Sequence, residues 1–124
     1  MFFWEIKFYY FLGRKNNEKL IELLEYYLRK RGENVKYYEY CFNYYYEIND
    51  LKQSFTYLKK CILEKKISKK WENWAVNFYV KKYILEKQYQ LAAKNAMELA
   101  DLQNLSQGNR VVLLKMLDYI KTKL

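Results

Sequence analysis

Apolar residues in this chain recur at an interval of 34 residues, and this repetition constrains the fold more than any other feature of the sequence. Within each set the steps are 4, 3, 9, 4 and 3 residues. Steps of 3 and 4 place residues on one face of a helix, so each set predicts two helices separated by a turn. The first set is Trp4, Phe8, Phe11, Leu20, Leu24 and Tyr27, and the second is Tyr38, Phe42, Tyr45, Ser54, Leu58 and Cys61. A third set, 38 residues after the second, is Val76, Val80, Tyr83, Ala92, Ala96 and Leu99.

A two-helix unit repeated at this interval is typical of stacked helical repeats, in which no unit buries its apolar face alone. We therefore expect an all-α fold of about three helix-turn-helix repeats, at residues 1–34, 35–68 and 73–106. Residues 107–124 are predicted to form an amphipathic capping helix. At 124 residues the chain is expected to be a single domain.

The absence of proline and the presence of only three glycines favour long helices joined by short turns. Asp50 with Gln53 resembles a capping pair, and Ser68 is a predicted N-cap. Residues 106–109 are predicted to be a loop. The predicted helices are 2–12, one around 20–28 that ends at Gly32, 37–48, one that begins after Asp50, one from Ser68 through Ile84, 89–102 and 111–124, the last with Leu113, Leu114 and Leu117 inward.

The formal charge of +9 favours an anionic partner, which is nucleic acid, an acidic protein face or a lipid headgroup layer. The composition does not choose among them. Cys41 and Cys61 lie within apolar stripes and lack any paired spacing, which predicts buried free thiols in a reducing compartment. The opening segment is too short to span a bilayer and lacks a signal-peptide pattern, so we expect a cytoplasmic protein without a membrane span.

The second repeat resembles the tetratricopeptide repeat (TPR), a 34-residue helix-turn-helix unit. Tyr38, Cys41, Phe42 and Tyr45 stand at its first-helix positions, and Ser54, Leu58 and Cys61 stand at its second-helix positions. The third repeat supplies Tyr83, Ala92 and Ala96, with a turn at 86–89. The sequence departs from the family at the turn glycine, which is replaced by Lys15, Asn49 or Lys87. The resemblance implies a right-handed superhelical stack whose first helices line a concave, partner-binding face.

Catalysis is not expected, because the chain lacks histidine and shows no phosphate loop, nucleophile elbow or dinucleotide fingerprint. No metal or other cofactor is predicted. The leading hypothesis is a non-enzymatic adaptor that binds a protein or peptide partner. Asparagine can bond a peptide backbone with one donor and one acceptor, and aromatic residues can form side-chain pockets. The first-helix residues left over from the core are Lys36, Glu39, Tyr40, Asn43 and Tyr46 in the second repeat, and Trp74, Asn77, Phe78 and Lys81 in the third.

The alternative is a nucleic-acid-binding protein that uses a lysine-rich region at residues 59–87. This region carries a net surplus of six positive charges over 29 residues. Trp71 and Trp74 interleave with the lysines, a mixture that can bind single-stranded nucleic acid. A solvated helix surface would give the same pattern. The candidate anion-binding residues are Lys65, Lys66, Lys69 and Lys70.

Overall fold

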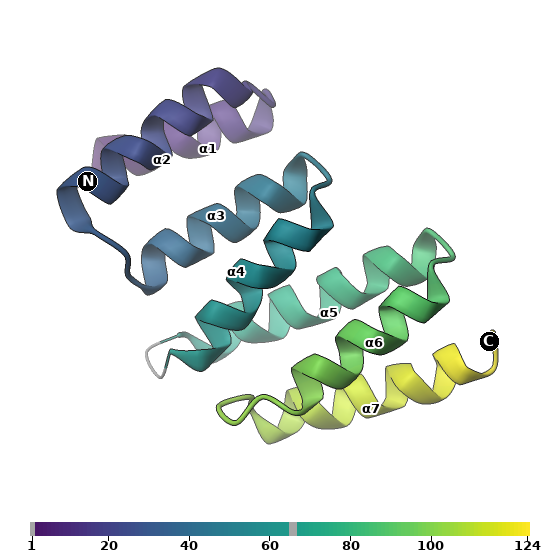
Figure 1. The fold of residues 1–124 in the computed structure, drawn as a ribbon. Coiled ribbons are helices and arrows are strands. Elements are labelled where there is room, and N and C mark those ends of the chain that lie inside the picture. Colours follow the sequence, from purple (N-terminus) through teal and green to yellow (C-terminus); the bar gives the residue numbers. More distant parts are fainter. Residues whose placement is uncertain (1, 65–66) are drawn as a thin grey trace. The chain divides into compact units, whose positions relative to one another are not determined.

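The computed structural model describes residues 2–64 and 67–124, and within these ranges every regular element is a helix and there is no strand. The all-α prediction is therefore confirmed. The helices are α1 (Phe2–Gly13), α2 (Asn17–Arg31), α3 (Val35–Glu47), α4 (Leu51–Leu63), α5 (Lys69–Leu85), α6 (Tyr89–Ala100) and α7 (Gln107–Lys121), as drawn in Figure 1. The chain divides into two compact units, Met1–Cys61 and Ile62–Leu124, and each is described by itself.

The same turn joins the helices of all three hairpins. Lys15, Asn49 and Lys87 have positive φ angles of 54°, 63° and 58°, respectively, and are the non-glycine residues with positive φ in the described chain. These are the positions at which the sequence lacks the turn glycine. The residue after each of these positive-φ residues donates a hydrogen bond from its backbone N–H to the carbonyl oxygen five residues earlier. These bonds run from Asn16 to Phe11, from Asp50 to Tyr45 and from Gln88 to Tyr83. The pattern is a Schellman motif, which satisfies carbonyls at the end of the first helix.

The repeat positions form the interior of the hairpins. Of the eighteen residues in the three sets, fifteen are buried, and Phe11, Tyr38 and Tyr45 are half-buried. Sequence periodicity and burial therefore agree fully at fifteen of the eighteen positions, and none of the eighteen is exposed. The turn and the apolar stripe repeat together, so the 34-residue interval reflects a recurring unit of structure.

Aromatic rings fill the core of the first unit. The Trp4 ring stacks on Phe8, with 5.2 Å between ring centroids, and lies 5.0 Å from Tyr27 and 4.8 Å from Tyr40. The Trp4 indole Nε1 donates a hydrogen bond of 2.8 Å to the carbonyl of Leu23, so its polar atom is satisfied. These contacts join α1 to α2 and also to α3.

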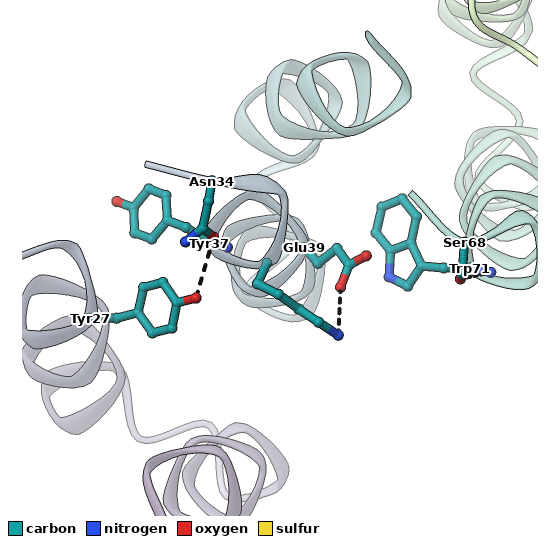
Figure 2. A network of polar contacts seen from close by, with 7 residues as sticks. Tyr27, Asn34, Tyr37, Glu39, Ser68 and Trp71 are labelled. Atoms are coloured by element: carbon teal, nitrogen blue, oxygen red, sulfur yellow. Dashed lines mark hydrogen bonds and ion pairs between the residues drawn. The ribbon is translucent and has the colours of Figure 1, made fainter. Parts of the chain in front are cut away.

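Asn34 connects the end of the first hairpin to the start of α3. Its Oδ1 accepts a 2.9 Å hydrogen bond from the backbone N–H of Tyr37, which caps the helix, and a 3.3 Å hydrogen bond from the Tyr27 hydroxyl (Figure 2). Tyr27 and Tyr37 are also stacked, with 6.1 Å between their centroids. One side chain therefore fixes both the start of α3 and its packing against α2.

Helices α5, α6 and α7 pack together in the second unit. The buried Glu72 carboxylate of α5 accepts hydrogen bonds from the Ser106 backbone N–H, at 3.0 Å, and from Asn109 Nδ2, at 2.7 Å. Asn109 Nδ2 also lies 2.7 Å from Asn73 Oδ1. A negative charge at a helix N-terminus is favourable, so Glu72 holds the start of α7 against α5.

Two predicted caps are confirmed, since Asp50 accepts a hydrogen bond from Gln53 N and Ser68 Oγ accepts one from Trp71 N. Cys41 and Cys61 are buried and neither forms a disulfide, as predicted. Burial raises the pKa of the Cys41 thiol to about 11 against the opposing effect of hydrogen bonds with the tyrosines around it.

The predicted end of the sixth helix at 102 and the predicted start of the last helix at 111 were wrong, whereas α7 does begin at 107, the first residue predicted for the capping helix. Helix α6 ends at Ala100, where the Arg110 guanidinium donates to the carbonyls of Ala100 and Leu102. Helix α7 begins at Gln107, within the predicted loop 106–109, because Ser106 Oγ caps it. Leu114 was also misplaced, since it is exposed while Leu113 and Leu117 are buried.

Lys87→Gly tests the left-handed turn. We expect the substitution to raise the free energy of unfolding by about 0.5–1 kcal/mol, because a Cβ is unfavourable at positive φ. Urea unfolding followed by circular dichroism measures the change. Lys94→Gly, at an exposed lysine inside α6, is the matched control and should lower stability by about 1 kcal/mol. Equal destabilisation by both substitutions would contradict the turn geometry.

Candidate partner-binding surface

One face of α3 carries most of the residues predicted for the second repeat. Lys36, Glu39, Asn43 and Tyr46 follow steps of 3, 4 and 3, which align them along the helix. Lys36 is exposed and the other three are half-buried, so each reaches the surface of the first unit. The Lys36 ammonium lies 3.5 Å from a Glu39 carboxylate oxygen (Figure 2).

The Glu39 carboxylate is set into the protein surface. Its side chain is 13% exposed, compared with 63% for that of Lys36. Burial raises the pKa of Glu39, while the charge and hydrogen bond of Lys36 act in the opposite direction and Glu5 adds a further increase. The effect of burial on the pKa is the largest, so the ion pair with Lys36 only partly offsets the loss of hydration of the carboxylate.

Tyr40 is not part of this exposed face, so its predicted placement among the exposed first-helix residues was wrong. The side chain is buried in the core of the first unit, with its ring 4.8 Å from that of Trp4 and 5.1 Å from that of Phe8. Burial raises the Tyr40 pKa, helped by the charge of Glu5 and by a hydrogen bond to it. Tyr40 instead joins the two first helices of this unit, α1 and α3.

Two residues of α1 belong to the same surface and were not predicted as site residues. Tyr9 is exposed and its ring lies 6.3 Å from that of Tyr40, while Glu5 is half-buried. Partial burial raises the pKa of Tyr9, and the negative charges of Glu5 and Glu39 raise it further. Glu5 and Tyr9 precede Glu39 and Asn43 by 34 residues, so the 34-residue repeat could have been used to predict that they lie on this surface.

The residues predicted for the third repeat form a separate aromatic strip on α5. The Trp74 ring lies 6.2 Å from Trp71 and 5.9 Å from Phe78, and both Trp74 and Phe78 are exposed. The Lys81 ammonium lies 6.0 Å from the centre of the Phe78 ring. The half-buried Asn77 donates a 2.6 Å hydrogen bond from Nδ2 to the Asn73 carbonyl of its own helix.

The lysine-rich region is only partly described. Lys65 and Lys66 lie outside the described residues. Lys69 and Lys70 are exposed in the first turn of α5, immediately before Trp71. Lys60, earlier in the region, places its ammonium 5.5 Å from the Tyr38 ring centre and 5.2 Å from that of Tyr57, so part of the basic charge packs on aromatic rings.

Comparisons with protein-family models, with curated proteins and with solved structures give no match. Among the helices of the described residues, none is both long enough and apolar enough to cross a membrane. The arrangement can provide charged and amide contacts on the first unit and an aromatic, cationic strip on the second. These groups suit recognition of another molecule.

Glu39→Gln tests the cost of the half-buried carboxylate. Because the pKa of Glu39 is raised in the folded protein, the charged carboxylate destabilises the folded state above that pKa. This destabilisation disappears at lower pH, where the carboxyl group is protonated. We expect Glu39→Gln to be more stable than the parent at pH 7, with a smaller advantage at pH 4. Urea unfolding at the two pH values measures this difference.

The Lys19–Glu22 pair offers a matched control, because it has the same spacing but both side chains are more than half exposed. Glu22→Gln removes an ion pair without removing a buried carboxylate, so its effect should be within about 0.5 kcal/mol at both pH values. A loss of stability in Glu39→Gln at pH 7, larger than that in Glu22→Gln, would mean that the ion pair outweighs burial.

Proposed function

We propose that this protein is a non-enzymatic, TPR-like adaptor that binds a peptide or protein partner on the face of its first helices. In the proposed arrangement the three hairpins and α7 form a right-handed superhelical stack. Helices α1, α3 and α5 line its concave side, and α7 caps it. The observation that carries the proposal is the recurrence of one turn geometry at Lys15, Asn49 and Lys87, in step with the apolar repeat.

Contacts within each unit support side-by-side first helices. In the first unit, Tyr40 of α3 packs on Trp4 and Phe8 of α1. In the second unit, Asn109 of α7 bonds to Glu72 of α5. In both cases the first helix of a hairpin contacts the helix that follows the hairpin, as well as the second helix of its own hairpin. A closed bundle does not require this order of contacts.

The chemistry of the exposed residues favours a peptide partner. On the first unit, the Lys36–Glu39 pair and Asn43 offer charges of both signs and an amide. On the second, exposed Trp74 and Phe78 offer apolar area beside the Lys81 ammonium. Amide side chains can bond an extended backbone, and aromatic residues contribute much of the binding energy at protein interfaces. Glu5 and Glu39 disfavour a partner whose C-terminal carboxylate docks at α1 and α3.

Asn43→Ala provides the direct test. A peptide is first selected from a random phage-displayed library with the full chain, and its affinity is then measured by fluorescence anisotropy. If the Asn43 amide bonds the peptide backbone, Asn43→Ala should weaken binding by about 1–3 kcal/mol and leave the melting temperature nearly unchanged. Asn77→Ala should weaken binding less, because the Asn77 amide already donates to Asn73.

Gln53→Ala, at an exposed amide on α4, is the control and should not change the affinity. An unchanged affinity in Asn43→Ala with a lowered melting temperature would assign this residue to the fold. If neither Asn43→Ala nor Trp74→Ala affects any selected peptide, the first-helix face is not the binding surface.

The second candidate function is single-strand nucleic-acid binding, favoured by exposed Lys69 and Lys70 beside the Trp71–Trp74 pair. Affinity for an oligonucleotide should then fall by about 0.7 log units per log unit of salt for each phosphate contacted. Converting these two lysines to glutamine should flatten the slope. For an adaptor we expect weak binding that vanishes near physiological salt. Tight binding that survives there would reverse the choice of function.

A further inference from the structure

The outer face of α1 exposes large apolar residues that the adaptor proposal does not use. Phe3 is 77% exposed, and Ile6 and Tyr10 are each 53% exposed, with exposed Lys7 among them. Steps of 3, 1 and 3 place these four residues on one face of the helix. Several large apolar side chains exposed on one helix face are typical of an interaction site.

Two cavities lie along this face, between α1 and α2. Their volumes are about 480 and 520 Å³, and Lys7 and Leu23 line both. The first is lined by Phe3, Trp4, Lys7, Leu23 and Tyr26, and the second by Ile6, Lys7, Tyr10, Phe11, Lys19, Glu22 and Leu23. We refer to the face and both cavities as the α1 outer groove.

The repeat shows what covers the same positions one unit later. The residues 34 positions after Phe3, Ile6, Lys7 and Tyr10 are Tyr37, Tyr40, Cys41 and Tyr44. In the first unit the last three are buried in the core cluster, and Tyr37 is packed against it. Equivalent positions are therefore covered on α3 and open on α1.

The α3 positions pack against α1 and α2, and the contacts from α2 indicate the chemistry of a helix that would fit the equivalent face of α1. Tyr27 of α2 lies 6.1 Å from Tyr37 and 5.6 Å from Tyr40 between ring centroids. Leu20, Leu24 and Tyr27 are the buried residues of α2, and they stand at positions i, i+4 and i+7. A helix with that stripe is the natural complement of this face, because the chain already uses one at the equivalent place.

The charges around the groove specify the polar part of the occupant. Lys7 stands where α3 has the uncharged Cys41 thiol. The Arg14 guanidinium lies 4.8 Å from the Tyr10 ring centre, and Lys19 pairs with Glu22 at 3.7 Å. The groove is therefore apolar with a positive excess. Because the chain as a whole carries +9, an acidic partner fits better than a second copy.

We propose that the α1 outer groove binds an acidic amphipathic helix of a partner protein. The helix presents large apolar residues at i, i+4 and i+7 to Phe3, Ile6 and Tyr10, with a carboxylate beside the stripe for Lys7. This binding mode packs a helix into an apolar groove, and its geometry is that of α2 on α3. It is independent of peptide binding at Asn43.

Two stapled, fluorescein-labelled helical peptides test the proposal with the full chain. Both carry Leu, Leu and Tyr at i, i+4 and i+7, and they differ only in having glutamate or lysine at i+3. Fluorescence anisotropy should show tighter binding of the glutamate peptide. The double variant Phe3→Ser/Tyr10→Ser should weaken it by at least about tenfold. Tyr119→Ser, at an exposed tyrosine of α7, is the control and should have no effect.

Charge reversal keeps the test decisive if the serine variant is unstable. Lys7→Glu alters an exposed side chain and should make the chain prefer the lysine peptide. Asn43→Ala should leave both affinities unchanged, which separates this groove from the proposed peptide site. Equal binding of both peptides, or no binding, overturns the proposal. A dimer seen by sedimentation equilibrium and lost in Phe3→Ser/Tyr10→Ser would assign the groove to a second copy instead.

Discussion

Within each compact unit, the structure depends on the packing of a helix hairpin against the helix that follows it, because a single hairpin cannot bury its own apolar stripe. Trp4 illustrates this dependence, since its ring contacts Phe8 on its own helix, Tyr27 on α2 and Tyr40 on α3. Burying a large apolar side chain contributes about 1.5–3 kcal/mol, so a few such contacts are comparable to the whole stability of a small domain. The first hairpin and α3 therefore stabilise one another.

The same constraint determines which surfaces are left for binding. On α3, the face toward the first hairpin is occupied by Tyr40 and Cys41, and the next face around the helix carries Lys36, Glu39 and Asn43. On α1, the equivalent of the occupied face is open, and apolar side chains remain exposed there. One repeating pattern thus accounts both for a polar candidate surface and for an apolar groove.

Periodicity was sufficient to predict the helices and the three turns, because each spacing has a direct physical meaning. The positions of Lys15, Asn49 and Lys87 followed from the repeat although none of them is glycine. The N-caps at Asp50 and Ser68 were also predictable, because each side chain accepts a hydrogen bond from a backbone N–H only three residues later in the sequence.

The errors arose where distant residues decide the outcome. The start of α7 depends on Glu72, which lies far from Ser106 in the sequence and accepts its N–H. Tyr40 was predicted on the surface because it is not among the apolar residues that recur at steps of 4 and 3. It is nevertheless buried, because α1 packs closely against α3. Leu114 was predicted inward as a continuation of the apolar repeat stripe together with Leu113 and Leu117, but it is exposed. Glu5 and Tyr9 were available from the repeat, but their role depends on the contact between α1 and α3.

The central proposal is that the hairpins stack as successive repeats, which would place α5 beside α3 as α3 lies beside α1. A crystal structure of the full chain tests this claim most directly. The account predicts successive first helices side by side, with axes about 8–10 Å apart, and the three hairpin turns along one edge of the stack. A closed bundle in which α3 and α5 are separated by other helices would contradict it.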